Sequence, residues 1–345
     1  MRISAPRSGL FNCALVAAIC CIAIGVRAAT SDPAATPPDS EAAVLPTPDA
    51  LASLPPYLPK APVEGTLILA GSSAMNQLAH LWACGLGDLH SGAKISIDMY
   101  ESGQVLPRLA KGEMQIGLMS RPLTEKELKD GGVVAFAAAK DVLGIVVNPD
   151  NPLEAISLEQ GVQLLRDPKS AERTGAATWG QLGLEGKWKE VPITLYGRSA
   201  GAGAWGYLVN RFLGEGAASR ASTDCTGYAD ICQRVAKDRG GVGYVSLSLS
   251  PPEVGKILAL QIDTGETIPP PQAGEPVDPR YPLVRELYVV LKWKPGDTLS
   301  PLAHEFLSYV LSRSGQEDVV KAGFIPMRRD EVLASRDQLG WTGKR

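Results

Sequence analysis

The sequence predicts an α/β fold in which mostly parallel strands alternate with helices. Short apolar or β-branched runs are each followed by a turn rich in glycine and serine, and then by a helical pattern. In the clearest helix, apolar residues recur at the i, i+3, i+4, i+7 spacing that gives a helix one buried face; they are Trp205, Leu208, Val209 and Phe212. Repeated strand, turn and helix units are typical of α/β domains.

The first half of the chain contains four expected strands and four expected helices. The strands are expected at 66–70, 95–100, 116–119 and 142–147. The helices are expected around 78–82 and 106–109, and at 124–128 and 158–165. Thr124 and Ser157 are the expected N-caps of the last two, because a hydroxyl at that position accepts a hydrogen bond from a first-turn N–H group.

The second half continues the same pattern. Strands are expected at 191–196, 242–247 and 283–293. Helices are expected at 205–212, 302–311 and 317–321.

Length and composition exclude several classes of protein. A chain of 345 residues with 45% hydrophobic residues can form two ordinary domains. Its 34 Lys+Arg residues against 37 Asp+Glu residues give a net charge of −3, which argues against sequence-independent nucleic-acid binding. Three His and six Cys residues argue against a multi-ligand zinc site. No cofactor or metal is therefore expected.

The N-terminus is typical of a secretory signal peptide. Arg2 and Arg7 precede an almost wholly apolar run at 10–26, and small residues follow it. We expect residues 1–28 to be removed by cleavage near Ala28, with the mature protein in the periplasm or secreted. The alternative is a membrane anchor, for which the run is close to the lower length limit.

A proline-rich linker is expected at 29–64. Nine prolines lie between residues 31 and 63, together with Ala, Ser, Thr and Asp. This composition predicts an extended, semi-rigid tether.

Three cysteines remain after cleavage, and two of them are close in the sequence. Cys225 and Cys232 are seven residues apart, so a disulfide between them would close a small loop. An exported chain lies in an oxidising compartment. We therefore favour this disulfide over free thiols.

Four strands end in a turn that can bind an anion. The turns are Gly71-Ser72-Ser73, Glu101-Ser102-Gly103, Ser120-Arg121 and the segment 198–203. Helix N-termini present unpaired N–H groups, and arginine adds bidentate recognition of oxyanions. Each turn alone is an ordinary helix cap. Four in one chain favour a pocket for a small oxyanion, provided that they converge.

The sequence also resembles the periplasmic phosphate-binding proteins of phosphate ABC importers over about residues 65–327. Several segments carry this resemblance in the same order as in the family. They are Gly71-Ser72-Ser73, Met119-Ser120-Arg121-Pro122-Leu123, Thr178-Trp179-Gly180-Gln181-Leu182-Gly183, Gly241-Val242-Gly243-Tyr244, Ser312-Arg313-Ser314-Gly315-Gln316 and Gly323-Phe324-Ile325-Pro326.

The resemblance implies a two-lobed periplasmic-binding-protein fold of the type II kind, with the ligand cleft between the lobes. Residues 65–145 with 255–345 are expected to form lobe 1, and residues 146–254 lobe 2. The implied function is capture of an inorganic oxyanion, with phosphate as the best single candidate. The expected partners are that anion and an ABC permease in the inner membrane. The expected state is a monomer without enzymatic activity.

The resemblance also implies a set of ligand-binding residues. Hydroxyl groups are expected from Ser73, Ser102 and Ser120, charge from Arg121 and Arg198, and backbone N–H groups from Ala74 and Gly203. Ser72 lies in the first turn, and Ser199 is a possible substitute donor. The family has Ser-Gly-Thr where this chain has Ala202-Gly203-Ala204. Two hydroxyl donors are thus missing, each worth about 1.5–3 kcal/mol to a charged partner.

Two other functions stay open. The segment 197–201 reads Gly-Arg-Ser-Ala-Gly, the G-x-S-x-G pattern of a nucleophile elbow. A serine hydrolase would use Ser199 with Asp263 or Asp297 and His304. Alternatively, the chain keeps the fold as a non-transporting interaction protein with a degenerate anion site.

Overall fold

Three parallel strands near the start of the chain form one part of the sheet. The computed structural model describes residues 51–169, 175–215, 217–249, 255–272, 277–294 and 296–341. In it, β1 pairs in parallel with both β2 and β3. These elements are β1 (Glu64–Ser72), β2 (Gly92–Tyr100), β3 (Ile116–Met119), and the helices α2 (Asn76–Leu89) and α3 (Val105–Ala110) that follow the first two strands.

A second parallel group comes from the middle of the chain. β6 pairs in parallel with β7 and β8. The elements are β6 (Thr194–Gly197), α6 (Gly203–Leu213), β7 (Thr223–Asp224), α7 (Tyr228–Lys237) and β8 (Gly241–Ser246). The helix α6 confirms the apolar periodicity of 205–212, whereas α7 was not predicted.

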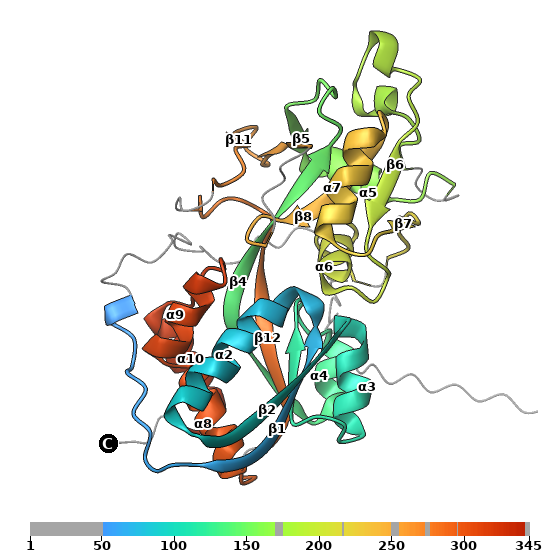
Figure 1. Ribbon diagram of the computed structural model, residues 1–345. Coiled ribbons are helices and arrows are strands. Elements are labelled where there is room, and N and C mark those ends of the chain that lie inside the picture. The colour runs from blue at the N-terminus through green and yellow to red at the C-terminus, as the bar shows by residue number, and fades with distance from the viewer. Residues whose placement is uncertain are drawn as a thin grey trace, which may run out of the picture. The chain divides into compact units, whose positions relative to one another are not determined.

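Two long antiparallel strands join these groups. β4 (Val133–Val147) pairs with β12 (Val284–Lys292) along residues 133–142 and with β8 along residues 143–147. The strand order is β2-β1-β3-β12-β4-β8-β6-β7, and Figure 1 shows β4 and β12 side by side. The α/β prediction is confirmed, and the sheet is mixed. The pairs that β4 makes with β12, β8 and β9, and the pair of β12 with β3, are antiparallel.

Two large hydrophobic cores define two lobes. The first contains Leu69, Trp82 and Phe306, and the second contains Trp179, Leu208 and Tyr244. Figure 1 shows α2, α8, α9 and α10 gathered on the first lobe. The segment 255–284 departs from its expected place in lobe 1, because its buried apolar side chains join the second core; they are Leu258, Leu260, Ile268, Val277, Tyr281 and Leu283.

The end of the predicted linker is packed, which corrects the tether expected at 29–64. Leu54 is 3% exposed in the first core, and the hydroxyl of Tyr57 donates to Glu305 at 2.6 Å. Apolar side chains between the prolines explain this packing, since they have a core to bury against. Residues 29–50 lie outside the described residues.

The remaining elements agree with most of the expected positions. Thr124 and Ser157 are the N-caps of α4 and α5, as predicted, and each also forms a capping box. The helices are α4 (Glu125–Gly131), α5 (Leu158–Leu165), α8 (Pro301–Val310), α9 (Arg313–Lys321) and α10 (Arg329–Gln338), with 3-10 turns η1 (Ser73–Met75), η2 (Ser102–Gln104), η3 (Trp179–Leu182) and η4 (Gly186–Trp188). The short strands are β5 (Ala155–Ser157), β9 (Lys256–Ile257), β10 (Ala259–Gln261) and β11 (Thr267–Ile268).

Within the described part of the chain, none of the helices has the length and apolar character that a membrane crossing needs. The predicted signal peptide at 1–28 lies outside the described residues.

Candidate anion-binding site

A small cavity lies where the predicted turns meet. Its volume is about 250 Å³, below the roughly 300–1,000 Å³ of typical pockets for drug-sized ligands. The size therefore suits a small ion. Seven of the ten predicted ligand residues line it: Ser72, Ser73, Ala74, Ser120, Arg198, Ala202 and Gly203. The other lining residues are Tyr100, Glu101, Ala204, Thr226, Gly227, Tyr228 and Leu249.

The walls come from the carboxyl ends of strands in both lobes. β1 and β3 deliver Ser72 and Ser120 from the first lobe, while the segments after β6 and β7 deliver Arg198 and Thr226 from the second. Open α/β sheets bind ligands at this edge because parallel strands all end there.

Helix starts at the cavity lack side-chain caps. The residues that precede η1, η2, α6 and α7 are Ser72, Glu101, Ala202 and Gly227, and none of them makes a side-chain capping bond. By contrast, α4, α5, α8 and α9, which start away from the cavity, are each capped by a Ser or Thr hydroxyl. First-turn N–H groups that are left uncapped can donate to an anion, and the helix dipole favours negative charge there.

Three serine hydroxyls form a buried chain behind the turns. Ser72 Oγ lies 2.8 Å from Ser120 Oγ, which in turn lies 3.3 Å from Ser102 Oγ. Ser102 Oγ also accepts a hydrogen bond from the Ser120 N–H at 3.1 Å. Ser102 is thus not among the cavity-lining residues. Its hydroxyl contacts Ser120, which does line the cavity.

Arg198 provides the positive charge among the residues that line the cavity. Its backbone N–H donates to the hydroxyl of Tyr244 at 2.9 Å, and its guanidinium donates to the carbonyl oxygen of Thr226. These contacts hold the start of the turn after β6 against the start of α7.

Arg121 is placed away from the cavity, contrary to the expectation. Its guanidinium donates to both carboxylate oxygens of Glu127, at 2.8 and 2.7 Å, and to the carbonyl of Pro122 at 2.8 Å. Burial raises the pKa of Glu127, but hydrogen bonds from Arg121 and Thr124 outweigh it and lower the pKa overall. The positive charge of Arg121 is therefore paired with the carboxylate of Glu127.

Ser199 is also directed elsewhere, because its hydroxyl donates to the carboxylate of Glu101. Glu101 lines the same cavity as Arg198. Such a carboxylate can accept a hydrogen bond from a protonated anion and repels a fully deprotonated one.

Sequence reasoning missed the wall formed by α7. Ile231, Cys232 and Val235 are buried on one face of that helix, and Asp230 and Arg234 form an i, i+4 ion pair on it. This spacing is a helix signal. It would have placed Thr226 and Gly227 at a fifth strand-to-helix turn.

The predicted disulfide between Cys225 and Cys232 is not formed in the structure, where both are buried free thiols. The Sγ of Cys225 donates to the carbonyl of Thr223, whereas Cys232 packs in the apolar cluster under α7. Burial raises the pKa of both thiols, that of Cys232 to about 11.

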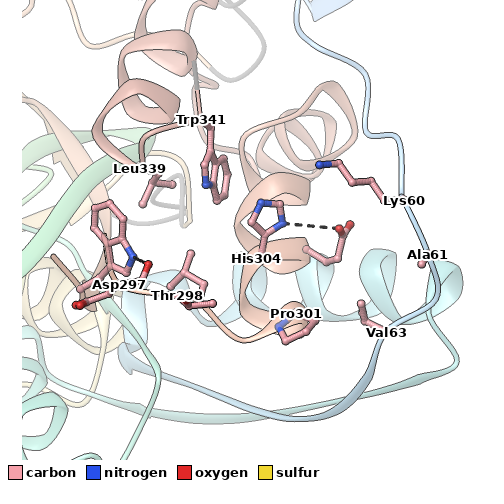
Figure 2. A pocket seen from close by; sticks show the side chains of 12 residues that line it. Lys60, Ala61, Val63, Asp297, Thr298, Pro301, His304, Leu339 and Trp341 are labelled. Atoms are coloured by element: carbon pink, nitrogen blue, oxygen red, sulfur yellow. Dashed lines mark hydrogen bonds and ion pairs between the residues drawn. The ribbon is translucent and has the colours of Figure 1, made fainter. Parts of the chain in front are cut away.

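His304, the expected partner of Ser199 in a hydrolase, lies at a second cavity of about 490 Å³ (Figure 2). Its ring packs 4.6 Å from that of Trp341, and its Nδ1 lies 3.8 Å from Glu305. Asp297 lines the same second cavity. The structure therefore does not bring Ser199, Asp297 and His304 together.

The fold and the site define a class of protein, a two-lobed solute-binding protein with its cavity between strand ends. The family model described as a PBP superfamily domain matches residues 59–314. The chain is 31% identical over 333 residues to the phosphate-binding protein PstS of Pseudomonas aeruginosa, covering 94% of this chain and 98% of that protein. It is 27% identical over 280 residues to PstS of Bacillus subtilis, covering 80% and 85%. The chain belongs to the family of the PstS phosphate-binding proteins.

Solved structures show the same fold. An ABC-type phosphate transport receptor from Vibrio cholerae matches 76% of this chain and 100% of its own, with a TM-score of 0.60 and 19% identity. A putative phosphate ABC transporter substrate-binding protein from Clostridium perfringens, solved with bound phosphate, matches the same shares with a TM-score of 0.58 and 20% identity.

Proposed function

We propose that this protein is an exported solute-binding protein that captures inorganic phosphate between its lobes and delivers it to an ABC importer. The observation that carries the proposal is the convergence of uncapped helix starts and Arg198 on one cavity of about 250 Å³. A small oxyanion accepts hydrogen bonds on every oxygen, so it fits a cavity whose lining includes serine hydroxyls, helix starts and a guanidinium.

Each group has a distinct task in this proposal. Arg198 supplies charge, and Ser73 and Ser120 supply hydroxyl donors. Backbone N–H groups near Ala74 and Gly203 complete the shell. Ser102 acts through Ser120, and Arg121 does not take part.

The absence of hydroxyls at Ala202 and Ala204 is compensated in part by the backbone. The N–H groups of the first turn of α6 are present whatever the side chain. Thr226 also lines the opposite wall, but its hydroxyl donates to Asp230 at 3.4 Å, so it is not counted as a donor to the anion. We therefore propose that phosphate still binds, with lower affinity than a site with both hydroxyls would give.

The remaining parts of the proposal concern the whole protein. They are export by residues 1–28, action as a monomer and docking to an inner-membrane permease; the docking is supported by the similarity to an ABC-type phosphate transport receptor. A closing motion about β4 and β12 would bring the walls of the cavity together around the anion.

A thermal-shift assay with phosphate and a labelling assay with a fluorophosphonate together separate the three candidate functions. Stabilisation by phosphate supports the proposal, since a ligand that binds only the folded state raises the unfolding temperature. Labelling of Ser199 by a fluorophosphonate would instead support a hydrolase. Neither response, in a protein shown to be folded, would favour an interaction protein without a ligand.

A further inference from the structure

Behind the cavity lies a fully buried ion pair, Asp141 and Arg285, which we name the hinge pair. Arg285 Nε and Nη2 both donate to Asp141 Oδ2, at 3.0 and 2.7 Å. Asp141 is 0% and Arg285 1% exposed. Desolvating two charges is costly, and such a pair is by itself weak evidence for stability. Its position therefore matters more than its existence.

The hinge pair lies where the two connecting strands pass from one core to the other. Along β4, Ala139 belongs to the first core and Val142 to the second. Along β12, Leu287 belongs to the first core and Leu283, just before the strand, to the second. Asp141 and Arg285 face each other directly in the register between these strands.

The hinge pair also contacts the cavity walls from behind. Arg285 Nη1 donates to the carbonyl oxygen of Ser120 at 2.9 Å, and Nη2 lies 3.3 Å from the hydroxyl of Tyr228. Ser120 directly follows β3 in the first lobe, and Tyr228 starts α7 in the second. One guanidinium thus touches both walls without lining the cavity.

The carboxylate side of the pair reaches the cavity as well. Ser246 Oγ, from β8, donates to Asp141 Oδ1 at 2.6 Å. Ser246 Oγ in turn accepts a hydrogen bond from the N–H of Leu249, a cavity-lining residue, at 3.2 Å.

We propose that Arg285, held by Asp141, is a positioning residue that latches the two walls of the anion cavity in the closed arrangement. The planar guanidinium has its donors in a fixed fork, so it fixes the directions of Ser120 and Tyr228 together. Moving α7 away breaks the bond to Tyr228 and leaves a buried donor without that partner, which opposes opening. The inference rests on the proposed function, because closure acts on the captured phosphate.

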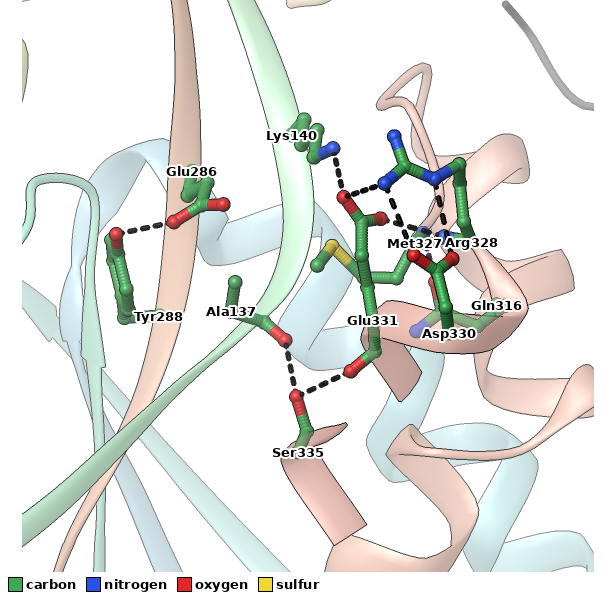
Figure 3. Close-up of polar contacts among 10 residues, drawn as sticks. All are labelled: Ala137, Lys140, Glu286, Tyr288, Gln316, Met327, Arg328, Asp330, Glu331 and Ser335. Atoms are coloured by element: carbon green, nitrogen blue, oxygen red, sulfur yellow. Dashed lines mark hydrogen bonds and ion pairs between the residues drawn. The ribbon is translucent and has the colours of Figure 1, made fainter. Parts of the chain in front are cut away.

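The neighbouring cross-strand pair offers a matched control. Lys140 and Glu286 are the next partners in the register, and strand alternation turns them to the opposite face. Lys140 Nζ donates to Glu331 Oε1 of α10 at 2.5 Å. Figure 3 shows this contact, and neither residue lines the cavity. Lys140→Met therefore removes an ion pair from the same strand without touching either wall.

Two variants test the latch. Because removing one member leaves an unpaired buried charge, the pair is replaced as a whole by Asp141→Leu with Arg285→Met, a change that such sites often tolerate. Tyr228→Phe removes only the hydroxyl that joins Arg285 to the second lobe. Circular dichroism establishes that each variant is folded.

Calorimetry with phosphate and amide hydrogen exchange without added anion are the two readouts. We expect the double variant to bind phosphate at least tenfold more weakly, and Tyr228→Phe about threefold more weakly, with Lys140→Met unchanged. We expect amide hydrogen exchange at 119–122 and 226–229 to be at least fivefold faster in the double variant than in the wild type. In Lys140→Met it should equal that of the wild type.

The outcomes separate the two proposals. Failure of the wild type to bind phosphate contradicts the proposed function. Hydrogen exchange then still tests whether Arg285 holds the two walls together, because it is measured without added anion. A folded double variant with wild-type exchange at both segments overturns the latch, whatever the wild type binds. Equal loss in Lys140→Met would also overturn it, since that variant reports only a general loss of rigidity in β4.

Discussion

The N–H of Gly103 donates a hydrogen bond to the carbonyl oxygen of Gly201, 3.1 Å away, and so joins the turn after β2 to the turn before α6. This bond connects the two lobes at the cavity. Two residues later, Gly203 lies so close to the first lobe that a Cβ on it would fall 3.0 Å from the backbone carbon of Ser120 and would collide with two serine hydroxyls. The close approach needs a residue without a side chain.

Gly203→Ala should therefore weaken phosphate binding at least tenfold, because the walls must move apart to admit the methyl group. Calorimetry measures the loss. Gly206→Ala on the same helix is the control, since its Cβ would meet only the flexible side chain of Arg121, at 3.1 Å. Equal losses in both variants would mean that helix α6, and not the contact with Ser120, is responsible.

Arg198→Ala should reduce phosphate affinity by about tenfold to a hundredfold, the value of one charge-assisted hydrogen bond of about 1.5–3 kcal/mol. Arg121→Ala should change it less than twofold, because Arg121 is bound to Glu127. Titrations of both variants at equal ionic strength test this. A larger loss of phosphate affinity in Arg121→Ala than in Arg198→Ala would show that Arg121 contacts the anion.

Ala202→Ser should strengthen phosphate binding by about tenfold, because it returns a hydroxyl donor at the start of α6. The free energy of unfolding without phosphate should rise by about 0.5–2 kcal/mol, because Ala202 is the N-cap residue of α6 and a serine hydroxyl there can accept a hydrogen bond from a first-turn N–H group. Unchanged affinity in the folded variant would show that the hydroxyl does not reach the anion.

Glu101→Gln should reduce the preference for phosphate over sulfate. Near neutral pH phosphate retains a proton that the Glu101 carboxylate can accept, whereas sulfate has none and is repelled. Competition between the two anions in the variant and the wild type measures the ratio. Ser199→Ala is the control, because it removes the donor to Glu101 but leaves the carboxylate charged.

The buried thiols predict a pH effect on stability. The folded-state pKa of Cys232 is raised to about 11 from its ordinary 9.0 by burial. The protonated thiol is thus favoured in the folded state, so this contribution is complete below pH 9 and is lost as the pH rises towards 11. Denaturant titrations between pH 8 and 11 should show falling stability, with a smaller fall in Cys232→Ala.

The helix N-caps could be predicted from the sequence because they depend on residues that are close together in the chain. Thr124 and Ser157 were identified as caps because capping needs only a hydroxyl and a nearby N–H group. The first half of β4 was missed because 133–141 is rich in alanine, which is depleted in strands. Its partner strand β12 also lies about 150 residues further along the chain, where no local pattern can indicate the pairing.

The candidate site shows the same limit. Turns at strand ends indicated Ser72, Ser120 and Arg198, and all three line one cavity in the structure. Neither the pairing of Arg121 with Glu127 nor that of Ser199 with Glu101 follows from spacing, because each depends on how the folded turns face one another.

Calorimetric titration of the mature protein, stripped of bound anion, with phosphate, sulfate and arsenate tests the central claim most directly. We predict a single phosphate site of micromolar or tighter affinity, similar binding of arsenate and weaker binding of sulfate. Absence of heat with all three anions, in protein shown to be folded, would contradict capture of an oxyanion.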